Sequence, residues 1–158
     1  VDYDYWDLVD VIAIISKSHK KTGSSQGHPT ADTSILQDVR VATANERLAV
    51  VKESIINRDF ETFATVVEED SNLMHSVMMT SRPPLFYWQP LSIELMTSIR
   101  EWREQEGIQV CYTLDAGPNV HCICIRNDAE KVKAKLESLS ETIDIRISPA
   151  GKGAYLID

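Results

Sequence analysis

The carboxylate with the clearest chemical potential is Asp115, which stands in "YTLDAGPN" between two apolar stretches. Pro118 fixes its own φ and Gly117 can adopt a positive φ, so residues 116–119 are predicted to form a stiff turn. Such a turn would hold Asp115 at the rim of a sheet, where partial burial would raise its pKa and suit it to proton transfer. Asp115 could equally bond the backbone N–H groups of its own turn, as aspartates commonly do. The residues alone leave the two interpretations open.

A second candidate site is the polar segment "HKKTGSSQGH", residues 19–28, which follows an apolar strand-like stretch and precedes a helix-like one. Its glycines would let the backbone approach a ligand closely, and its N–H and hydroxyl groups suit phosphate oxygens. The hydroxyl donors are Thr22, Ser24 and Ser25, and the nearby cations are Lys20 and Lys21. The spacing is not that of a Walker A loop. Composition favours an ordinary solvent-exposed loop over an anion-binding one and leaves both open.

A third group, Ser71, Asn72 and His75, is polar within a stretch that otherwise resembles a buried helix. Asn72 and His75 are three residues apart and therefore lie on neighbouring helix faces. Polar groups that face inward from the middle of a helix need hydrogen-bond partners. Bonds to loops packed on the helix are therefore favoured over a direct catalytic role.

The cysteines Cys111, Cys122 and Cys124 lie in strand-like segments without a CxxC spacing. This pattern indicates reduced thiols in a cytosolic protein. The histidines outside the polar helix have no metal-ligand spacing with one another or with the cysteines, so no metal site is predicted.

Length and composition indicate one globular domain over residues 1–158, because 43% of the residues are hydrophobic and 25% are charged. The formal net charge of -8 argues against nonspecific binding of nucleic acid, which needs a cationic face. No apolar run approaches the roughly 20 residues that a membrane-spanning helix requires, so no membrane partner is expected.

The elements that would position these residues follow from hydrophobic periodicity and from turn residues. Asp32 and Thr33 are possible N-caps of the first long helix, and Gly107 is a natural helix end. Strands are predicted at residues 7–18, 108–114, 120–126, 142–148 and 153–158, helices at 35–57, 60–79, 92–106 and 128–139, and irregular chain at 19–30 and 81–90.

The predicted order of strands and helices indicates an α+β fold with a mainly antiparallel sheet and helices packed on one face. The strands on either side of Asp115 are joined by a tight turn and are therefore antiparallel. No internal repeat or long linker divides the chain.

Taken in order, the segments "KKTGSSQGH", "DTS", "RDFETFA", "DSNLMHS", "PPLFYW" and "YTLDAGPN" resemble those of mevalonate diphosphate decarboxylases, which belong to the GHMP superfamily of small-molecule kinases. The resemblance runs from about Trp6 to the C-terminus. It implies the fold of a GHMP kinase C-terminal domain.

The resemblance also implies an activity. These enzymes use ATP to phosphorylate the C3 hydroxyl of 5-diphosphomevalonate, and phosphate then leaves with CO2 to give isopentenyl diphosphate. Asp115 matches the family's catalytic aspartate, which would orient or deprotonate that hydroxyl, and positioning should dominate such a phosphoryl transfer. Ser24 matches the serine that contacts the phosphate end of the substrate, with Ser25 as its weaker neighbour. Supporting roles fall to Lys20, Thr22, Asn72 and His75.

The resemblance covers only the C-terminal half of the family enzymes. Their N-terminal half carries the ATP loop and would hold most of the ATP and Mg²⁺, so this chain alone is expected to form an incomplete active site. Family members are often cytoplasmic homodimers, and the same is expected of the complete enzyme.

Two departures from the family pattern leave alternatives open. The loop ends in "QGH" where better-known decarboxylases have Gly-Met, and the turn continues as "NVH". Both changes could mark a phosphomevalonate decarboxylase that yields isopentenyl phosphate. A noncatalytic domain that keeps the fold without the ATP-binding half is a further alternative. A C3 kinase without decarboxylation is disfavoured, because Asp115 is retained.

Overall fold

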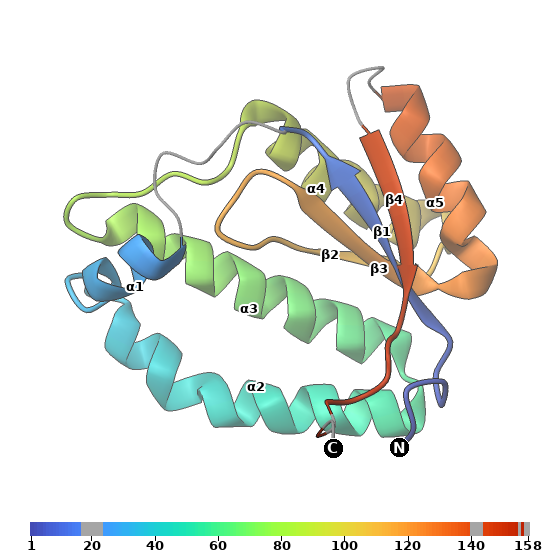
Figure 1. Cartoon of the computed structure of the whole chain (residues 1–158), viewed down its shortest axis with the longest axis horizontal. Helices are drawn as coiled ribbons and strands as arrows, with labels where there is room; N and C mark the ends of the chain where they lie inside the picture. Colours follow the sequence, from blue (N-terminus) through green and yellow to red (C-terminus); the bar gives the residue numbers. More distant parts are fainter. Residues whose placement is uncertain (17–23, 140–143, 155, 157–158) are drawn as a thin grey trace.

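The computed structural model describes residues 1–16, 24–139, 144–154 and 156, which form one sheet and its surrounding helices (Figure 1). The strands and helices are β1 (Leu8–Ile14), α1 (Ser24–Ala31), α2 (Gln37–Asn57), α3 (Phe60–Thr80), α4 (Pro90–Glu106), β2 (Val110–Thr113), β3 (Val120–Ile125), α5 (Arg126–Leu139) and β4 (Asp144–Pro149).

The four strands are arranged in the order β2-β3-β1-β4, and every neighbouring pair is antiparallel. This confirms the predicted α+β class with an antiparallel sheet. The hairpin around Asp115 is also confirmed, because β2 pairs with β3 and Thr113 lies opposite His121. Gly107 ends α4 with a φ of 68°, the left-handed conformation expected of a helix C-cap.

The main core lies between one face of the sheet and the helices α4 and α5. Alternate residues of β1 and β3 point into it, as the period of two in a strand requires. The fully buried contributors include Val11, Val120 and Cys122 from the strands and Leu95, Ile99, Val132 and Leu136 from the helices. A smaller cluster forms on α3, where Phe63 and Cys111 are buried and Trp6 meets Phe63 edge to face at 5.3 Å.

Helix α3 covers the edge of the sheet that β2 would otherwise expose. An edge strand presents unpaired backbone groups, and here charged side chains from two helices bond them. Arg103 donates from Nη1 to the Val110 carbonyl at 2.8 Å, and Glu68 accepts from the N–H of Tyr112 at 3.4 Å. Glu68 and Arg103 also pair with each other at 2.7 Å, and each side chain is only 8% exposed.

The prediction of irregular chain throughout residues 19–30 is wrong, because Ser24–Ala31 forms α1. Its glycine and proline counted as helix breakers, yet tertiary packing selects the helix. Gly27 is buried, and a Cβ at this position would lie 2.8 Å from the Tyr87 hydroxyl oxygen. Glycine therefore allows this close approach between α1 and Tyr87, although it is a poor helix former.

The predicted caps of the long helix are also wrong. α2 begins at Gln37, and its N-cap residue Leu36 makes no side-chain cap bond. The Thr33 hydroxyl bonds elsewhere, donating to the Thr30 carbonyl at 2.6 Å and accepting from the N–H of Arg82 at 2.7 Å.

The apolar spacing of α2 predicted a helix correctly but not its buried face. Val39 and Leu48 are 60% and 49% exposed, whereas Arg47 is buried. Arg47 is drawn inward because its Nε donates to the Asp70 carboxylate of α3 at 2.8 Å. In Figure 1 the two helices run side by side below the sheet.

The predicted final strand is not found among the described residues at the C-terminus. Residues 153, 154 and 156 lie outside any strand, and Leu156 is 95% exposed. The chain after β4 runs on past the end of the sheet (Figure 1), so these residues have no neighbouring strand with which to pair.

Candidate active site

The turn between β2 and β3 is fixed from outside by two polar side chains. The Ser92 hydroxyl of α4 donates to the Pro118 carbonyl at 2.8 Å. Asn119 accepts with its Oδ1 from the N–H groups of Ile15 and Ser16, at 3.0 and 3.2 Å. These bonds attach the turn to α4 and to the chain that leaves β1. Among the described glycines only Gly107 has a positive φ, so the turn's position depends on these bonds and on Pro118 rather than on a left-handed Gly117.

Two side chains of α3 hold the backbone immediately before Asp115. The Ser71 hydroxyl oxygen accepts from the N–H of Leu114 at 3.0 Å, and His75 Nε2 lies 3.3 Å from the Leu114 carbonyl oxygen. Both backbone polar groups of Leu114 are therefore bonded to one helix, four residues apart on the same face. These contacts agree with the prediction that the polar residues of this helix bond to a segment packed on it.

The His75 imidazole is buried, with only 1% of the residue exposed, and packs 4.9 Å from the Trp88 ring. Burial lowers its pKa, although the Leu114 carbonyl and the negative charge of Asp115 oppose the shift. His75 is therefore neutral near pH 7. Because a carbonyl oxygen can only accept, the proton of the neutral ring must be on Nε2.

Asn72 contacts the same strand one step earlier. Its Nδ2 donates to the Tyr112 hydroxyl at 3.0 Å. Tyr112 is buried, and its burial raises the pKa of its hydroxyl. Asn72 therefore supports β2 through a side chain, whereas Ser71 and His75 hold the backbone that leads to Asp115.

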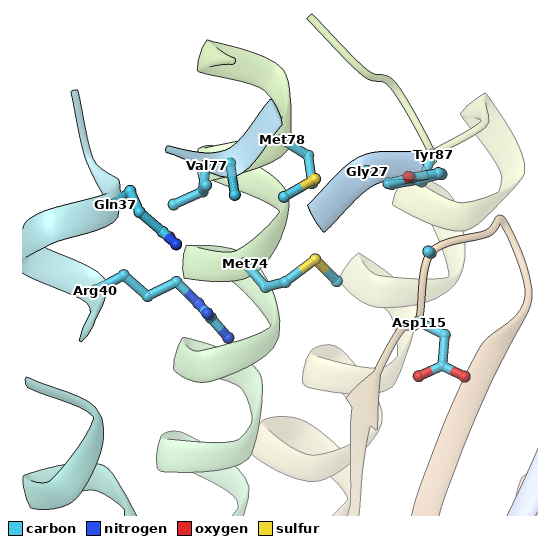
Figure 2. A pocket seen from close by; sticks show the side chains of 10 residues that line it. Gly27, Gln37, Arg40, Met74, Val77, Met78, Tyr87 and Asp115 are labelled. Carbon is cyan, nitrogen blue, oxygen red and sulfur yellow. The ribbon is translucent and has the colours of Figure 1, made fainter. Parts of the chain in front are cut away.

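Asp115 itself is exposed, which corrects the expectation of partial burial. The buried chain ends at Leu114, and the turn carries the next residue past the rim of the sheet. Asp115 lines a cavity of about 260 Å³ together with residues from α1, α2, α3 and the segment before α4. Figure 2 shows Met74 and Met78 of α3 between the α2 side chains Gln37 and Arg40 and the wall that bears Tyr87 and Asp115.

Of the predicted phosphate-binding residues, the structure describes only the backbone of Ser24 and Ser25. Lys20 and Thr22 lie outside the described residues. Ser24 and Ser25 form the first turn of α1, and their side chains also lie outside the described part of the structure. The described chain on either side of this loop is close to the turn, because Asn119 bonds Ile15 and Ser16, and Gly27 lines the same cavity as Asp115.

The sequence reasoning missed a histidine–aspartate pair on the face of the sheet opposite the main core. His121 Nδ1 lies 2.7 Å from the Asp10 carboxylate, and both side chains are about one quarter exposed. The hydrogen bond to Asp10 raises the pKa of His121, and the negative charges of Asp10 and Asp115 add to the shift. The antiparallel register of β1 and β3 brings the pair together across a sequence separation that periodicity does not report.

The remaining titratable residues do not form a metal cage in the described ranges: no group of three or more His, Cys, Asp or Glu could hold a metal ion there. All three cysteines are free and buried, and burial raises the pKa of Cys124 to about 12. No helix among the residues searched is long and apolar enough to cross a membrane.

Comparison with known proteins supplies the family context for this geometry. Residues 10–149 match the family model described as the mevalonate 5-diphosphate decarboxylase C-terminal domain. The diphosphomevalonate decarboxylase of Aspergillus fumigatus is 33% identical over 139 residues, which cover 85% of this chain and 34% of that protein.

Solved structures share the fold. Mevalonate pyrophosphate decarboxylase from Streptococcus pyogenes superposes with a TM-score of 0.85 at 24% identity, covering 96% of this chain and 47% of that one. A complex described as "MDDEF in complex with MVAPP, AMPPCP and Magnesium" gives a TM-score of 0.83 at 25% identity, covering 94% and 46%. The chain thus spans about a third of the curated relative and just under half of each solved chain.

Proposed function

The chain belongs to the mevalonate 5-diphosphate decarboxylase family, and from this premise we propose that it contributes the catalytic aspartate to an ATP-dependent decarboxylase of 5-diphosphomevalonate. In the complete enzyme, Asp115 orients or deprotonates the C3 hydroxyl of the substrate. The observation that carries the proposal is the placement of Asp115, which is exposed on a cavity wall while Ser71 and His75 hold the residue before it.

The proposed reaction has two steps. The C3 oxygen attacks the γ-phosphorus of ATP, ADP leaves, and the hydroxyl proton passes to Asp115 or to solvent. The C3–O bond then breaks with its electron pair on the departing phosphate, while the C1–C2 pair forms the new double bond and CO2 leaves. Asp115 acts in the first step, where a carboxylate within reach of the hydroxyl contributes by position and by charge.

The remaining residues divide into binding and positioning roles. Ser24, with Ser25 beside it, contacts the phosphate end of the substrate, and Lys20 and Thr22 supply charge and hydrogen bonds in the same loop. His75 acts through the backbone before Asp115. Asn72 acts through the Tyr112 side chain of β2, and neither residue touches substrate. ATP and Mg²⁺ are the proposed cofactors, since the complex of a relative contains AMPPCP and magnesium. We infer that both are held mainly by parts of the enzyme outside this chain.

The proposal is tested by assaying the complete gene product with 5-diphosphomevalonate and 5-phosphomevalonate side by side, following phosphate release and ATP consumption. Phosphate release with the diphosphate is the expected result. Turnover of the monophosphate alone would replace the substrate assignment with the phosphomevalonate branch. No turnover of either compound would favour a noncatalytic domain.

A further inference from the structure

The cavity beside Asp115 contains polar atoms that the described protein leaves unpaired. Gln37 Oε1, Arg40 Nε and the Tyr87 hydroxyl are each buried and have no hydrogen-bond partner within the described part of the chain. All three residues line this one cavity. Leaving a buried polar group unpaired is unfavourable, so three such groups around one cavity indicate a bound polar ligand.

The unpaired atoms lie at two ends of the cavity. Figure 2 shows Gln37 and Arg40 reaching in from α2, and Tyr87 on the opposite side with Asp115. Figure 2 shows Met74 and Met78 between the two ends. The rest of the lining is also largely apolar and includes Ala31, Val77 and Ala116. A cavity with this lining fits a small molecule with an apolar middle and a polar group at each end.

Arg40 is available for a ligand because it shares its carboxylate partner, Asp70, with Arg47. Its Nη2 lies 3.9 Å from the Asp70 carboxylate, the outer limit of an ion pair, whereas Arg47 contacts the same carboxylate at 2.8 Å. Arg47 therefore satisfies most of the charge of Asp70. Within the described part of the chain the buried Arg40 Nε–H has no acceptor, and a guanidinium can only donate.

We propose that Arg40, with Gln37 one turn earlier on α2, forms an anion-binding subsite across the cavity from Asp115. The subsite takes a carboxylate or phosphate group of the ligand whose hydroxyl end faces Asp115 and Tyr87. A guanidinium suits both anions because its donors match their paired oxygens. Gln37 can present either its oxygen or its NH2 group by turning its amide. This inference rests on the proposed function, since it assigns a second part of the same site.

The test uses three variants of the complete gene product. Arg40→Gln removes the charge, and Gln37→Glu places a carboxylate where the anion would bind. Glu at the first residue of a helix is favourable for the helix dipole, so the second variant should fold even if Arg40→Gln does not. Arg100→Gln is the matched control, because Arg100 is an exposed arginine of α4 that does not line this cavity.

Two readouts are combined. In turnover assays, KM for the phosphorylated mevalonate should rise at least about tenfold in Arg40→Gln and Gln37→Glu and stay unchanged in Arg100→Gln, since hydrogen bonds to charged groups contribute about 1.5–3 kcal/mol. In calorimetric titrations, mevalonate probes the carboxylate and inorganic pyrophosphate probes the phosphates. If the variants weaken the binding of mevalonate but not of pyrophosphate, Arg40 binds the carboxylate. If they weaken the binding of pyrophosphate but not of mevalonate, Arg40 binds a phosphate.

The two proposals can fail separately. Suppose that the wild type is active and that Arg40→Gln and Gln37→Glu have the same KM and the same titrations. The subsite would then be wrong, and the proposed function would stand. An inactive wild type would contradict the function, and the titrations would then decide the subsite alone: loss of anion binding in both variants supports it, while unchanged or absent binding in the wild type overturns it.

Discussion

The Nε2 atom of His75 lies 3.3 Å from the carbonyl oxygen of Leu114, the residue that directly precedes Asp115. Ser71, one helical turn before His75, accepts from the N–H of the same residue. The position of Asp115 is therefore fixed by α3 through the backbone. The bonds from α3 to Leu114, together with the stiff turn, determine where the Asp115 carboxylate lies.

Replacing Ser71 by alanine should lower turnover and stability together. The N–H of Leu114 would lose its partner in a buried place, which costs about 1–3 kcal/mol in free energy of unfolding. We expect kcat of the complete enzyme to fall while KM changes little, because Ser71 does not touch substrate. Ser76→Ala is the control on the same helix, since the Ser76 hydroxyl donates to the Asn72 carbonyl within α3. Equal effects of the two substitutions on kcat would argue against the positioning role.

The burial of His75 should make the fold sensitive to acid. Burial lowers the pKa of His75 below its usual value of 6.5, so the unfolded chain binds a proton that the folded chain excludes. The stability from neutral His75 is present above pH 6.5 and is lost as the pH falls through its folded pKa. In urea denaturation, the free energy of unfolding should fall less between pH 7 and pH 5 in His75→Gln than in the wild type. An equal fall in both proteins would contradict this assignment.

His121 should have the opposite effect on the pH dependence of stability. The hydrogen bond to Asp10 raises the pKa of His121 above 6.5, so the folded chain binds the proton more tightly than the unfolded chain. Its stabilising effect is complete below pH 6.5 and disappears as the pH rises through the folded pKa. In His121→Asn, the decline of unfolding free energy above pH 6.5 should shrink. Direct titration of the His121 ring by NMR checks the sign, and a pKa below 6.5 would refute it.

Breaking the buried pair between Glu68 and Arg103 should destabilise the sheet edge without altering chemistry. Glu68→Gln leaves the buried Arg103 guanidinium with only the exposed Glu61 carboxylate, at 3.8 Å, and breaking a buried pair costs about 3–5 kcal/mol. Chemical denaturation should show this loss, whereas Glu104→Gln, at an exposed pair on α4, should change stability by less than about 1 kcal/mol. A loss in Glu68→Gln no larger than in Glu104→Gln would mean that the pair does not hold β2.

Much of the fold could be predicted because its signals are local. The helical spacing of residues 60–79, the glycine at 107 and the tight turn between two apolar stretches each depend on nearby residues. α1 was missed because contact with Tyr87, 60 residues away from Gly27 in the sequence, outweighs the poor helix propensity of glycine. The inward side of α2 was missed because an ion pair with Asp70 buries Arg47.

The candidate site could be predicted only in part. The motif resemblance indicated Asp115, and the structural interpretation of Ser71, Asn72 and His75 anticipated bonds to a neighbouring segment. The partners of those bonds lie 39 to 43 residues away for His75 and Ser71, and spacing along the chain cannot supply them. Likewise, the Ser92 bond to Pro118 spans 26 residues and depends on how α4 packs against the turn.

The catalytic role of Asp115 is tested most directly by replacing it with asparagine in the complete enzyme and measuring substrate binding and turnover separately. We expect an unchanged melting temperature and near-normal affinity for the phosphorylated mevalonate. Phosphate release should fall by about 10²- to 10⁴-fold, the usual contribution of a general base. Asp7→Asn serves as the control, because Asp7 is an exposed aspartate paired with Arg126. Wild-type turnover in Asp115→Asn would mean that the carboxylate held in place by the turn and α3 has no catalytic role.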